Sequence, residues 1–145
     1  MKNLFLIIIL ITIIFSCTIP EVENFEFNNP KFNNIKEACE WINNNIKYKK
    51  ENGNNWKLPQ ETLDDKNGDC EDMAILLMAI MEYQKGYESE LIIVKLDNNI
   101  YHAIVLWKDK YYDCTSGKTI GNKDYTITEK YDYYTTMYEA KYKKN

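Results

Sequence analysis

Residues 67–74 read NGDCEDMA and place one cysteine, Cys70, among three acids. This stretch decides the fold, because the segment from Cys70 to Lys85 is apolar on most sides and Gly86 follows it as a left-handed stop. We therefore predict a buried helix with Cys70 in its first turn. The acids raise a question, since negative charge beside a thiol disfavours the thiolate.

The three acids around Cys70 suit the start of a helix. Asp69 at the N-cap and Asp72 three residues later form an acidic version of the capping box, and Glu71 favours the positive end of the helix. Successive residues step about 100° around a helix, so Glu71 and Asp72 need not face the sulfur. A second role is open to Asp69, Glu71 and Asp72, because calcium takes carboxylate oxygens. Capping is favoured, since one local cluster rarely supplies a full set of calcium ligands.

The first sixteen residues have the features of an export signal. Lys2 precedes an apolar run from Leu4 to Phe15, which is too short to span a bilayer and has the length of a signal h-region. The run ends in IFSC, residues 14–17, which resembles the lipobox of bacterial lipoproteins. The resemblance implies an exported lipoprotein, anchored at the periplasm or cell surface through acylated Cys17. An ordinary cleaved signal and an uncleaved anchor are the alternatives.

Composition bounds the remainder of the chain. Removing residues 1–16 takes away one lysine and no acid, so the net charge of −4 becomes more negative, which argues against a nucleic-acid partner. Residues 17–32 lack a sustained period, and we predict a tether there and one domain over 33–145. With Cys17 taken by lipid, three cysteines remain, and an odd number in an exported protein suggests a free thiol.

The order of elements predicts an α+β domain. From Asn34, apolar residues recur at three- and four-residue steps, as in an amphipathic helix, with Cys39 buried on its apolar face. Residues 51–69 are polar and predict a long loop. Short turns after the Cys70 helix predict antiparallel hairpins. The predicted strands span 90–96, 100–107 and 110–115, with one more near 125–128 and a short helix from about residue 131.

His102, the only histidine, lies in the second predicted strand and shares a face with Ile104. A two-residue turn at 108–109 sets Ile104 opposite Asp113, which makes Asp113 a diagonal neighbour of His102 within reach of its ring. A turn of odd length would put the two on opposite faces. A cysteine at a helix start, a histidine on one strand and an acid on the next supply a nucleophile, a base and a group that orients the base.

Four segments together resemble the transglutaminase-like superfamily, and most closely the bacterial periplasmic transglutaminase-like cysteine peptidases. They are Trp56-x-x-Pro59-x-Glu61-Thr62-Leu63, Gly68-Asp69-Cys70-Glu71-Asp72-x-Ala74, His102-Ala103, and Asp113 before Thr115 and Gly117. The resemblance implies a papain-like core, in which the helix bearing the cysteine packs on an antiparallel sheet bearing the histidine and the acid. It implies no required cofactor, although related peptidases are known for calcium dependence. The short region before Trp56 implies a reduced substrate groove.

The same resemblance implies the roles of Cys70 as nucleophile, His102 as general base and acid, and Asp113 as orienting group. We expect the helix start and the imidazolium to lower the pKa of Cys70. The oxyanion hole would use the Cys70 backbone N–H and a donor from the preceding loop, for which Trp56 and Gln60 are candidates. The alternatives are a core anchor for Trp56 and a solvated side chain for Gln60. Cys114 points to the other face of the sheet from its neighbour in sequence, where we expect it to serve packing.

The function predicted from these residues is a membrane-tethered cysteine hydrolase, a peptidase acting on protein substrates through an acyl-enzyme thioester at Cys70. If an amine replaces water, the same site becomes a transglutaminase-type acyl transferase. A third reading is a lipoprotein that binds peptide without turnover, which the small size and reduced groove favour. The presence of all three catalytic residue types favours an enzyme.

Overall fold

The computed structural model describes residues 25–27, 30–53, 55–96, 99–120 and 125–143. The predicted signal segment and Cys17 lie outside the described residues. Among the residues that are described, no helix combines the length and the apolar character that crossing a membrane requires.

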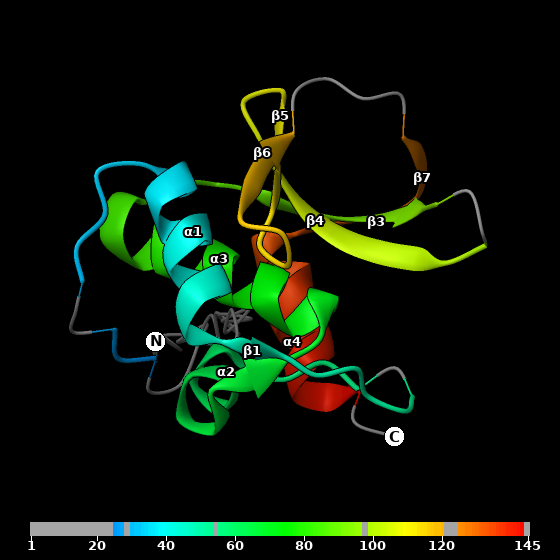
Figure 1. Cartoon of the computed structure of the whole chain (residues 1–145), viewed down its shortest axis with the longest axis horizontal. Helices are drawn as coiled ribbons and strands as arrows, with labels where there is room; N and C mark the ends of the chain where they lie inside the picture. The colour runs from blue at the N-terminus through cyan, green and yellow to red at the C-terminus, as the bar shows by residue number, and fades with distance from the viewer. Residues whose placement is uncertain (1–24, 28–29, 54, 97–98, 121–124, 144–145) are drawn as a thin grey trace, which may run out of the picture.

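The described residues form an α+β domain with helices packed on an antiparallel sheet, as predicted (Figure 1). The helices are α1 (Ile35–Asn45), α2 (Pro59–Asp65), α3 (Cys70–Lys85) and α4 (Tyr133–Tyr142). The strands are β1 (Lys47–Tyr48), β2 (Asn67–Gly68), β3 (Glu90–Lys95), β4 (Tyr101–Trp107), β5 (Lys110–Asp113), β6 (Lys118–Ile120) and β7 (Thr126–Asp132). The long strands pair in the order β6-β5-β4-β3-β7, while β1 and β2 form a separate parallel pair.

Helix α3 is the centre of the domain. Its side chains from Asp72 to Met81 are all buried, so the helix has no solvent-exposed face along most of its length. A helix that is apolar all round is stable only when neighbours cover every side, and here α1, α2, α4 and strand β4 do so. The helix ends at Gly86, which adopts the left-handed conformation (φ 61°) predicted for it, with its N–H bonded to the carbonyl of Glu82.

The sheet carries hydrophobic residues on both faces. Ala103 and Val105 of β4 belong to the main core with α3, whereas Ile104 belongs to a smaller cluster with Ile92 and Val94 of β3. Alternate residues of a strand point to opposite faces, so β4 separates the two clusters. His102 lies on the same face of β4 as Ile104, near the start of the strand.

The turn between β4 and β5 has the two-residue length that the sequence predicted. Lys108 (φ 47°) and Asp109 (φ 59°) both adopt left-handed conformations, as in the type I′ turns that match the twist of a hairpin. Trp107 then pairs with Lys110, and the same register places Asp113 opposite Ile104. The turn therefore brings Asp113 onto the face of the sheet that carries the histidine.

Part of the segment predicted as a tether, residues 17–32, packs against the domain. In its described part, Phe25, Phe27 and Phe32 are buried against the helices, and the Phe27 ring lies edge-on to Trp41 with 5.3 Å between ring centroids. Burying three aromatic side chains offsets the entropy lost when this segment becomes ordered. The prolines and asparagines nearby conceal this aromatic pattern in the sequence.

The predicted loop over residues 51–69 also contains a helix that the sequence analysis missed. Pro59 occupies the first turn of α2, where its missing N–H costs nothing, and the Glu61 carboxylate accepts the Leu58 N–H at 2.7 Å. The helix ends at Lys66 in a left-handed conformation. Seven residues are too few for the apolar periodicity of a helix to be recognised in sequence.

The hairpin turn generates a stability prediction. Asn-Gly suits a type I′ turn better than Lys-Asp, because glycine adopts a positive φ without steric cost and asparagine tolerates it. We expect the double substitution Lys108→Asn and Asp109→Gly to raise the free energy of unfolding by about 1 kcal/mol in urea titrations. The control is Lys110→Asn, one residue beyond the turn, which should give no increase. An equal gain in the control would contradict the assignment of the effect to the turn.

Candidate active site

Cys70 is the first residue of α3, and the acids around it form the predicted capping box. The Asp69 carboxylate accepts the Asp72 N–H at 3.3 Å, and the Asp72 carboxylate accepts the Asp69 N–H at 3.2 Å. Each acid thus satisfies a backbone donor at the helix start. Burial, followed by the charges of Asp72 and Glu71, raises the pKa of Asp69 to about 7.

Asp72 also connects the start of α3 to the segment before α2. Its side chain is fully buried, and its second oxygen accepts the backbone N–H of Lys57 at 2.8 Å. Gly68 permits this arrangement, because a Cβ atom added there would lie 2.6 Å from the Asp72 Cβ. The carboxylate thereby fixes the position of Trp56, the residue before Lys57, relative to the helix that carries the cysteine.

The carboxylates of Asp69 and Asp72 serve the helix cap in the structure described, and the calcium role of Asp69, Glu71 and Asp72 stays a prediction. Both oxygens of Asp72 accept backbone N–H groups, and Asp72 lies 4.0 Å from the ammonium of Lys57. Among the described residues, no group of three or more His, Cys, Asp or Glu side chains converges as metal ligands do. Calcium needs six or more oxygen ligands, so other donors would have to complete this cluster, whereas the hydrogen bonds described are those of a helix cap.

The Cys70 thiol lies where α3 meets β4. Its residue is 8% exposed, and its Sγ donates a hydrogen bond to the Glu71 carboxylate at 2.8 Å. Burial and then the Glu71 carboxylate raise the pKa of Cys70 to about 12, while a hydrogen bond with the backbone of Ala103 acts in the opposite direction. The sulfur therefore lies beside the residue that follows His102.

This environment corrects one expectation from the sequence and decides a point that the sequence left open. Glu71 does face the sulfur, because its side chain is long enough to reach back over the first turn of the helix. The pKa of Cys70 is raised and not lowered, because burial and then the Glu71 carboxylate, which accepts the hydrogen bond of the thiol, disfavour the thiolate. In the arrangement described, the cysteine is a neutral thiol at pH 7.

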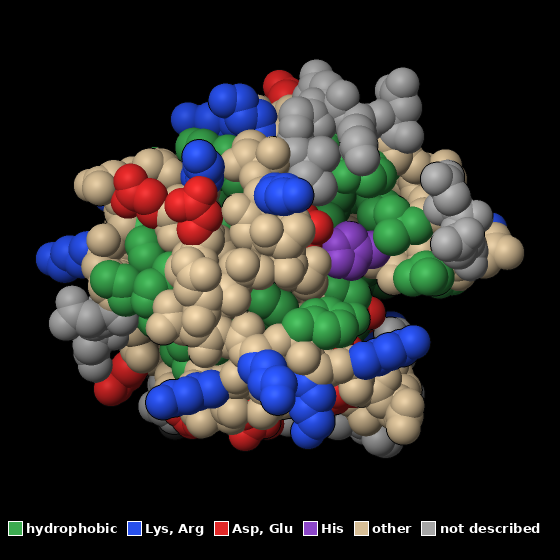
Figure 2. Space-filling view, in the orientation of Figure 1, with side chains coloured by type: hydrophobic (Ala, Val, Ile, Leu, Met, Phe, Trp, Pro, Cys, Tyr) green, Lys and Arg blue, Asp and Glu red, His purple; other side chains and the backbone are tan. Residues whose placement is uncertain are grey.

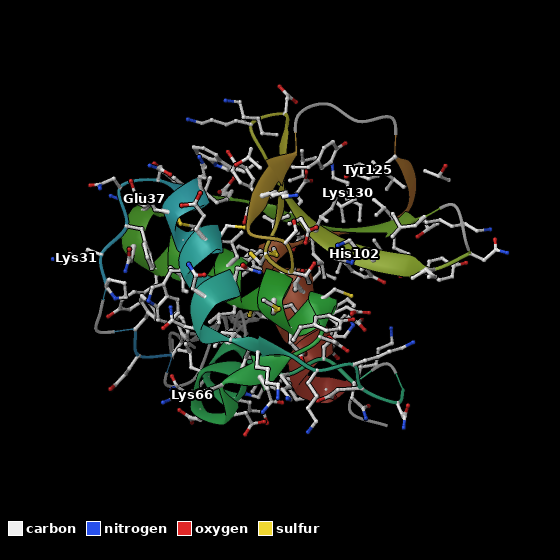
Figure 3. The ribbon with its side chains drawn as sticks, in the orientation of Figure 1. Lys31, Glu37, Lys66, His102, Tyr125 and Lys130 are labelled. Carbon is white, nitrogen blue, oxygen red and sulfur yellow. The ribbon has the colours of Figure 1, made fainter. Side chains whose placement is uncertain are left out.

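His102 and Asp113 are brought together as the hairpin register predicts. The Nε2 atom of His102 lies 3.2 Å from an Asp113 oxygen, and the histidine side chain is 19% exposed. Figure 3 labels His102 on β4, and Figure 2 shows this only histidine, in purple, at the surface with hydrophobic side chains beside it. With Nε2 bonded to the carboxylate, the Nδ1 atom of a neutral ring is the one that can accept a proton from a thiol.

The turn after β5 holds the Asp113 carboxylate in place. One oxygen accepts the Thr115 N–H at 3.0 Å and the Thr115 hydroxyl at 2.6 Å, and the other accepts the Ser116 hydroxyl at 2.9 Å. Burial raises the pKa of Asp113, but the hydrogen bonds with His102, Thr115 and Ser116 outweigh burial and hold that pKa well below its usual range. The carboxylate is ionised and fixed, as an orienting group for a histidine must be.

The two candidate oxyanion donors differ in their surroundings. The Gln60 side chain is engaged on α2, where its amide N–H donates to Asp64 at 2.9 Å and its carbonyl accepts the Glu26 N–H. The Trp56 ring packs edge-on to Tyr131 at 5.2 Å, and its buried indole N–H has no hydrogen-bond partner. Trp56 is thus a core anchor with an unused donor, and its oxyanion role stays a prediction.

Tyr48 is a residue near the site that the sequence analysis missed. It pairs with Gly68 in the β1–β2 ladder. Burial, followed by the charges of Cys70, Asp69 and Glu71, raises the pKa of the Tyr48 phenol, which places the phenol near these groups. Strands of two residues leave no periodic signal in sequence, so this proximity could not be predicted.

The environment of Asp113 predicts how stability depends on pH. The folded protein lowers the pKa of Asp113 below its unfolded value of 3.8, so its stabilising contribution is complete above that value and is lost as the pH falls through the folded pKa. We expect Asp113→Asn to lower the free energy of unfolding at pH 7 by about 2 kcal/mol, and by progressively less below about pH 4. Urea titrations from pH 3 to 7 measure this, with the exposed Glu88→Gln as control. A loss that does not vary with pH would contradict the ionic role.

Comparisons with known proteins agree with this fold. LapG of Legionella pneumophila matches with a TM-score of 0.53 and 19% identity over 70% of this chain and 67% of that one, and its calcium-bound form gives the same values. Its EGTA-treated form matches with a TM-score of 0.54 and 17% identity over 67% of this chain and 61% of that one. At such identities the likeness shows the fold alone.

A comparison with curated proteins found no match. The family described as "Transglutaminase-like domain" matches residues 22–114, which is more than half of the chain and spans the cysteine, the histidine and the aspartate of the site. The chain therefore belongs to the transglutaminase-like domain family.

Proposed function

We propose that this protein is a cysteine hydrolase that cleaves amide bonds in peptides or proteins, with Cys70 as nucleophile, His102 as base and Asp113 as orienting group. The observation that carries the proposal is the His102–Asp113 pair at 3.2 Å, one residue from the backbone group that contacts the Cys70 sulfur. A nucleophile at a helix start and a histidine held by a carboxylate are the groups that acyl transfer requires.

The reaction begins with transfer of the Cys70 proton to Nδ1 of His102. Because Asp113 holds Nε2, it orients the ring and stabilises the imidazolium that forms. The thiolate attacks the substrate carbonyl, and the imidazolium then protonates the leaving amine, which leaves a thioester on Cys70. Water, deprotonated by the same imidazole, attacks the thioester and releases the acid, and the imidazolium returns its proton to the departing Cys70 sulfur.

Glu71 must release the thiol before this sequence can start, because it accepts the Sγ–H in the structure described. A substrate that displaces the Glu71 carboxylate, or turns it toward solvent, removes two causes of the raised pKa of Cys70, the charge and the hydrogen bond. The positive end of α3 and the Ala103 backbone then favour the thiolate.

The oxyanion that forms during attack needs donors close to the sulfur. The Cys70 backbone N–H at the helix start supplies one, and the unpartnered indole N–H of Trp56 is the candidate for the second. Asp72 holds the Lys57 backbone against the helix start and so limits how far Trp56 can move.

Two other functions remain compatible with the site. An amine that replaces water would make the protein an acyl transferase of the transglutaminase type, with the same thioester. A peptide-binding protein without turnover is favoured by one observation, the neutral thiol held by Glu71. We further propose that the chain is exported and anchored to a membrane through lipidated Cys17, which rests on the sequence of residues 1–17 alone.

The catalytic proposal predicts that cleavage of a protein substrate requires Cys70 and His102. We expect the protein to cleave denatured casein, Cys70→Ala to abolish cleavage, and His102→Ala to slow it by about 10²–10⁴-fold, because general acid–base catalysis contributes that range. Cleavage is followed by mass spectrometry, with and without a primary amine such as cadaverine. Cys39→Ala is the control and should retain activity per folded molecule.

The products distinguish the three functions. New peptide termini indicate hydrolysis, and cadaverine attached to glutamine side chains without cleavage indicates acyl transfer. Casein bound equally by the wild type and by Cys70→Ala, with neither product formed, would refute the enzyme and favour the binding protein.

The contact between Glu71 and Cys70 predicts the pH dependence of alkylation. Since the Glu71 carboxylate raises the pKa of Cys70, Glu71→Gln should lower that pKa by about one unit or more and raise the iodoacetamide rate near pH 8 roughly tenfold. The matched control is Glu88→Gln, an exposed acid beyond the end of α3. Equal alkylation profiles for the wild type and Glu71→Gln would show that Glu71 does not restrain the thiol.

A further inference from the structure

We infer that Cys39 of α1 and Cys114, which follows β5, form a disulfide bond in the oxidised protein. Their Sγ atoms lie 3.2 Å apart although the residues are 75 positions apart in the chain. A disulfide bond is about 2.05 Å long, so the two sulfurs must approach by roughly 1 Å, which small side-chain rotations can supply. In the structure described both are thiols, with Cys114 donating to Cys39.

Among the cysteines of the described domain, pairing Cys39 with Cys114 leaves Cys70 as the free thiol. The chain has four cysteines, and Cys17 lies outside the described domain. Of the other three, Cys39 and Cys114 contact each other, whereas Cys70 contacts Glu71 and the backbone of β4. Pairing Cys39 with Cys114 therefore accounts for the odd number of cysteines in the domain and keeps the nucleophile unpaired.

Burial determines when this bond can form. Cys39 is 1% exposed and Cys114 is 3% exposed, so an oxidant cannot reach either sulfur in the folded domain. Burial also raises the pKa of Cys114 well above its ordinary value, which suppresses the thiolate needed for exchange. The bond must therefore form while the chain folds or when α1 opens locally.

The reaction requires an oxidant, which is a small-molecule disulfide such as oxidised glutathione. One cysteine thiolate attacks oxidised glutathione, forms a mixed disulfide and releases one glutathione thiol. The second cysteine attacks the protein sulfur of the mixed disulfide and releases the second glutathione thiol. The protein loses two hydrogens, and one glutathione disulfide is reduced to two thiols.

The bond would connect α1 covalently to the turn that holds Asp113. The two are already joined, because the Asn43 side chain of α1 donates to the carbonyls of Cys114 at 3.1 Å and Thr115 at 2.7 Å. Gly117 allows this approach, since a Cβ atom there would lie 3.1 Å from Asn43 atoms. Because Thr115 also donates to the Asp113 carboxylate, the disulfide would restrain the group that orients His102.

The test compares the full chain folded with oxidised glutathione and with a reducing agent, with Cys17→Ser as the background to exclude the fourth cysteine. The samples are unfolded in iodoacetamide, digested and analysed by mass spectrometry. We expect the oxidised sample to contain the Cys39 peptide linked to the Cys114 peptide, with carbamidomethyl only on Cys70. We also expect its Tm to exceed that of the reduced sample by roughly 10 °C, since the bond closes a long loop in the unfolded chain.

Two variants make the result decisive. Cys39→Ala combined with Cys114→Ala should have the same Tm in both conditions, whereas Cys70→Ala should keep the difference between them. Alkylation of both Cys39 and Cys114 after folding with oxidised glutathione, or a link from either to Cys70, would overturn the inference. So would a redox-dependent Tm that persists in the double variant. None of these outcomes depends on whether the protein is a peptidase.

Discussion

The rest of the site depends on the hydrogen bonds that the buried carboxylate of Asp72 accepts. It accepts backbone N–H groups from Asp69 and Lys57, so one fully buried side chain defines the start of α3 and fixes the preceding segment against it. Burying an acid this deeply is unfavourable, and burial raises its pKa to about 6 despite these hydrogen bonds. The position of the Cys70 sulfur against β4 follows from where the helix begins.

The same acids have opposite effects on two properties of the site, the stability of the helix start and the reactivity of the thiol. Carboxylates at the start of α3 satisfy its free N–H groups and interact favourably with its dipole. Negative charge at that location also stabilises the protonated thiol, because the Glu71 carboxylate adds to burial in raising the pKa of Cys70. A helix start that is optimal for stability is therefore not optimal for a nucleophile. In the proposed mechanism, movement of Glu71 resolves the conflict, since Asp69 and Asp72 alone form the capping box.

Elements could be predicted from the sequence where a long apolar segment, a helix cap or a short turn marks them. The apolar composition of α3, its Asp69 cap and its Gly86 stop are local features, and the two-residue hairpin turn sets the register that joins His102 to Asp113. Two features depend on contacts between distant segments, namely the packing of Phe25 and Phe27 and the proximity of Tyr48 to the site. The orientation of Glu71 depends on one side-chain rotamer. The periodicity of the sequence carries no information about long-range contacts or about single rotamers.

The complete burial of α3 has a consequence for how the domain opens. Amide groups in the middle of this helix can exchange hydrogen with solvent only when α1, α2, α4 and the sheet separate from it together, which amounts to global unfolding. Strand β7 forms one edge of the sheet and most of its residues are exposed, so it can detach in smaller fluctuations. The helix that carries Cys70 thus belongs to the most slowly exchanging part of the molecule. Fluctuations of the edge strand can occur without moving Cys70.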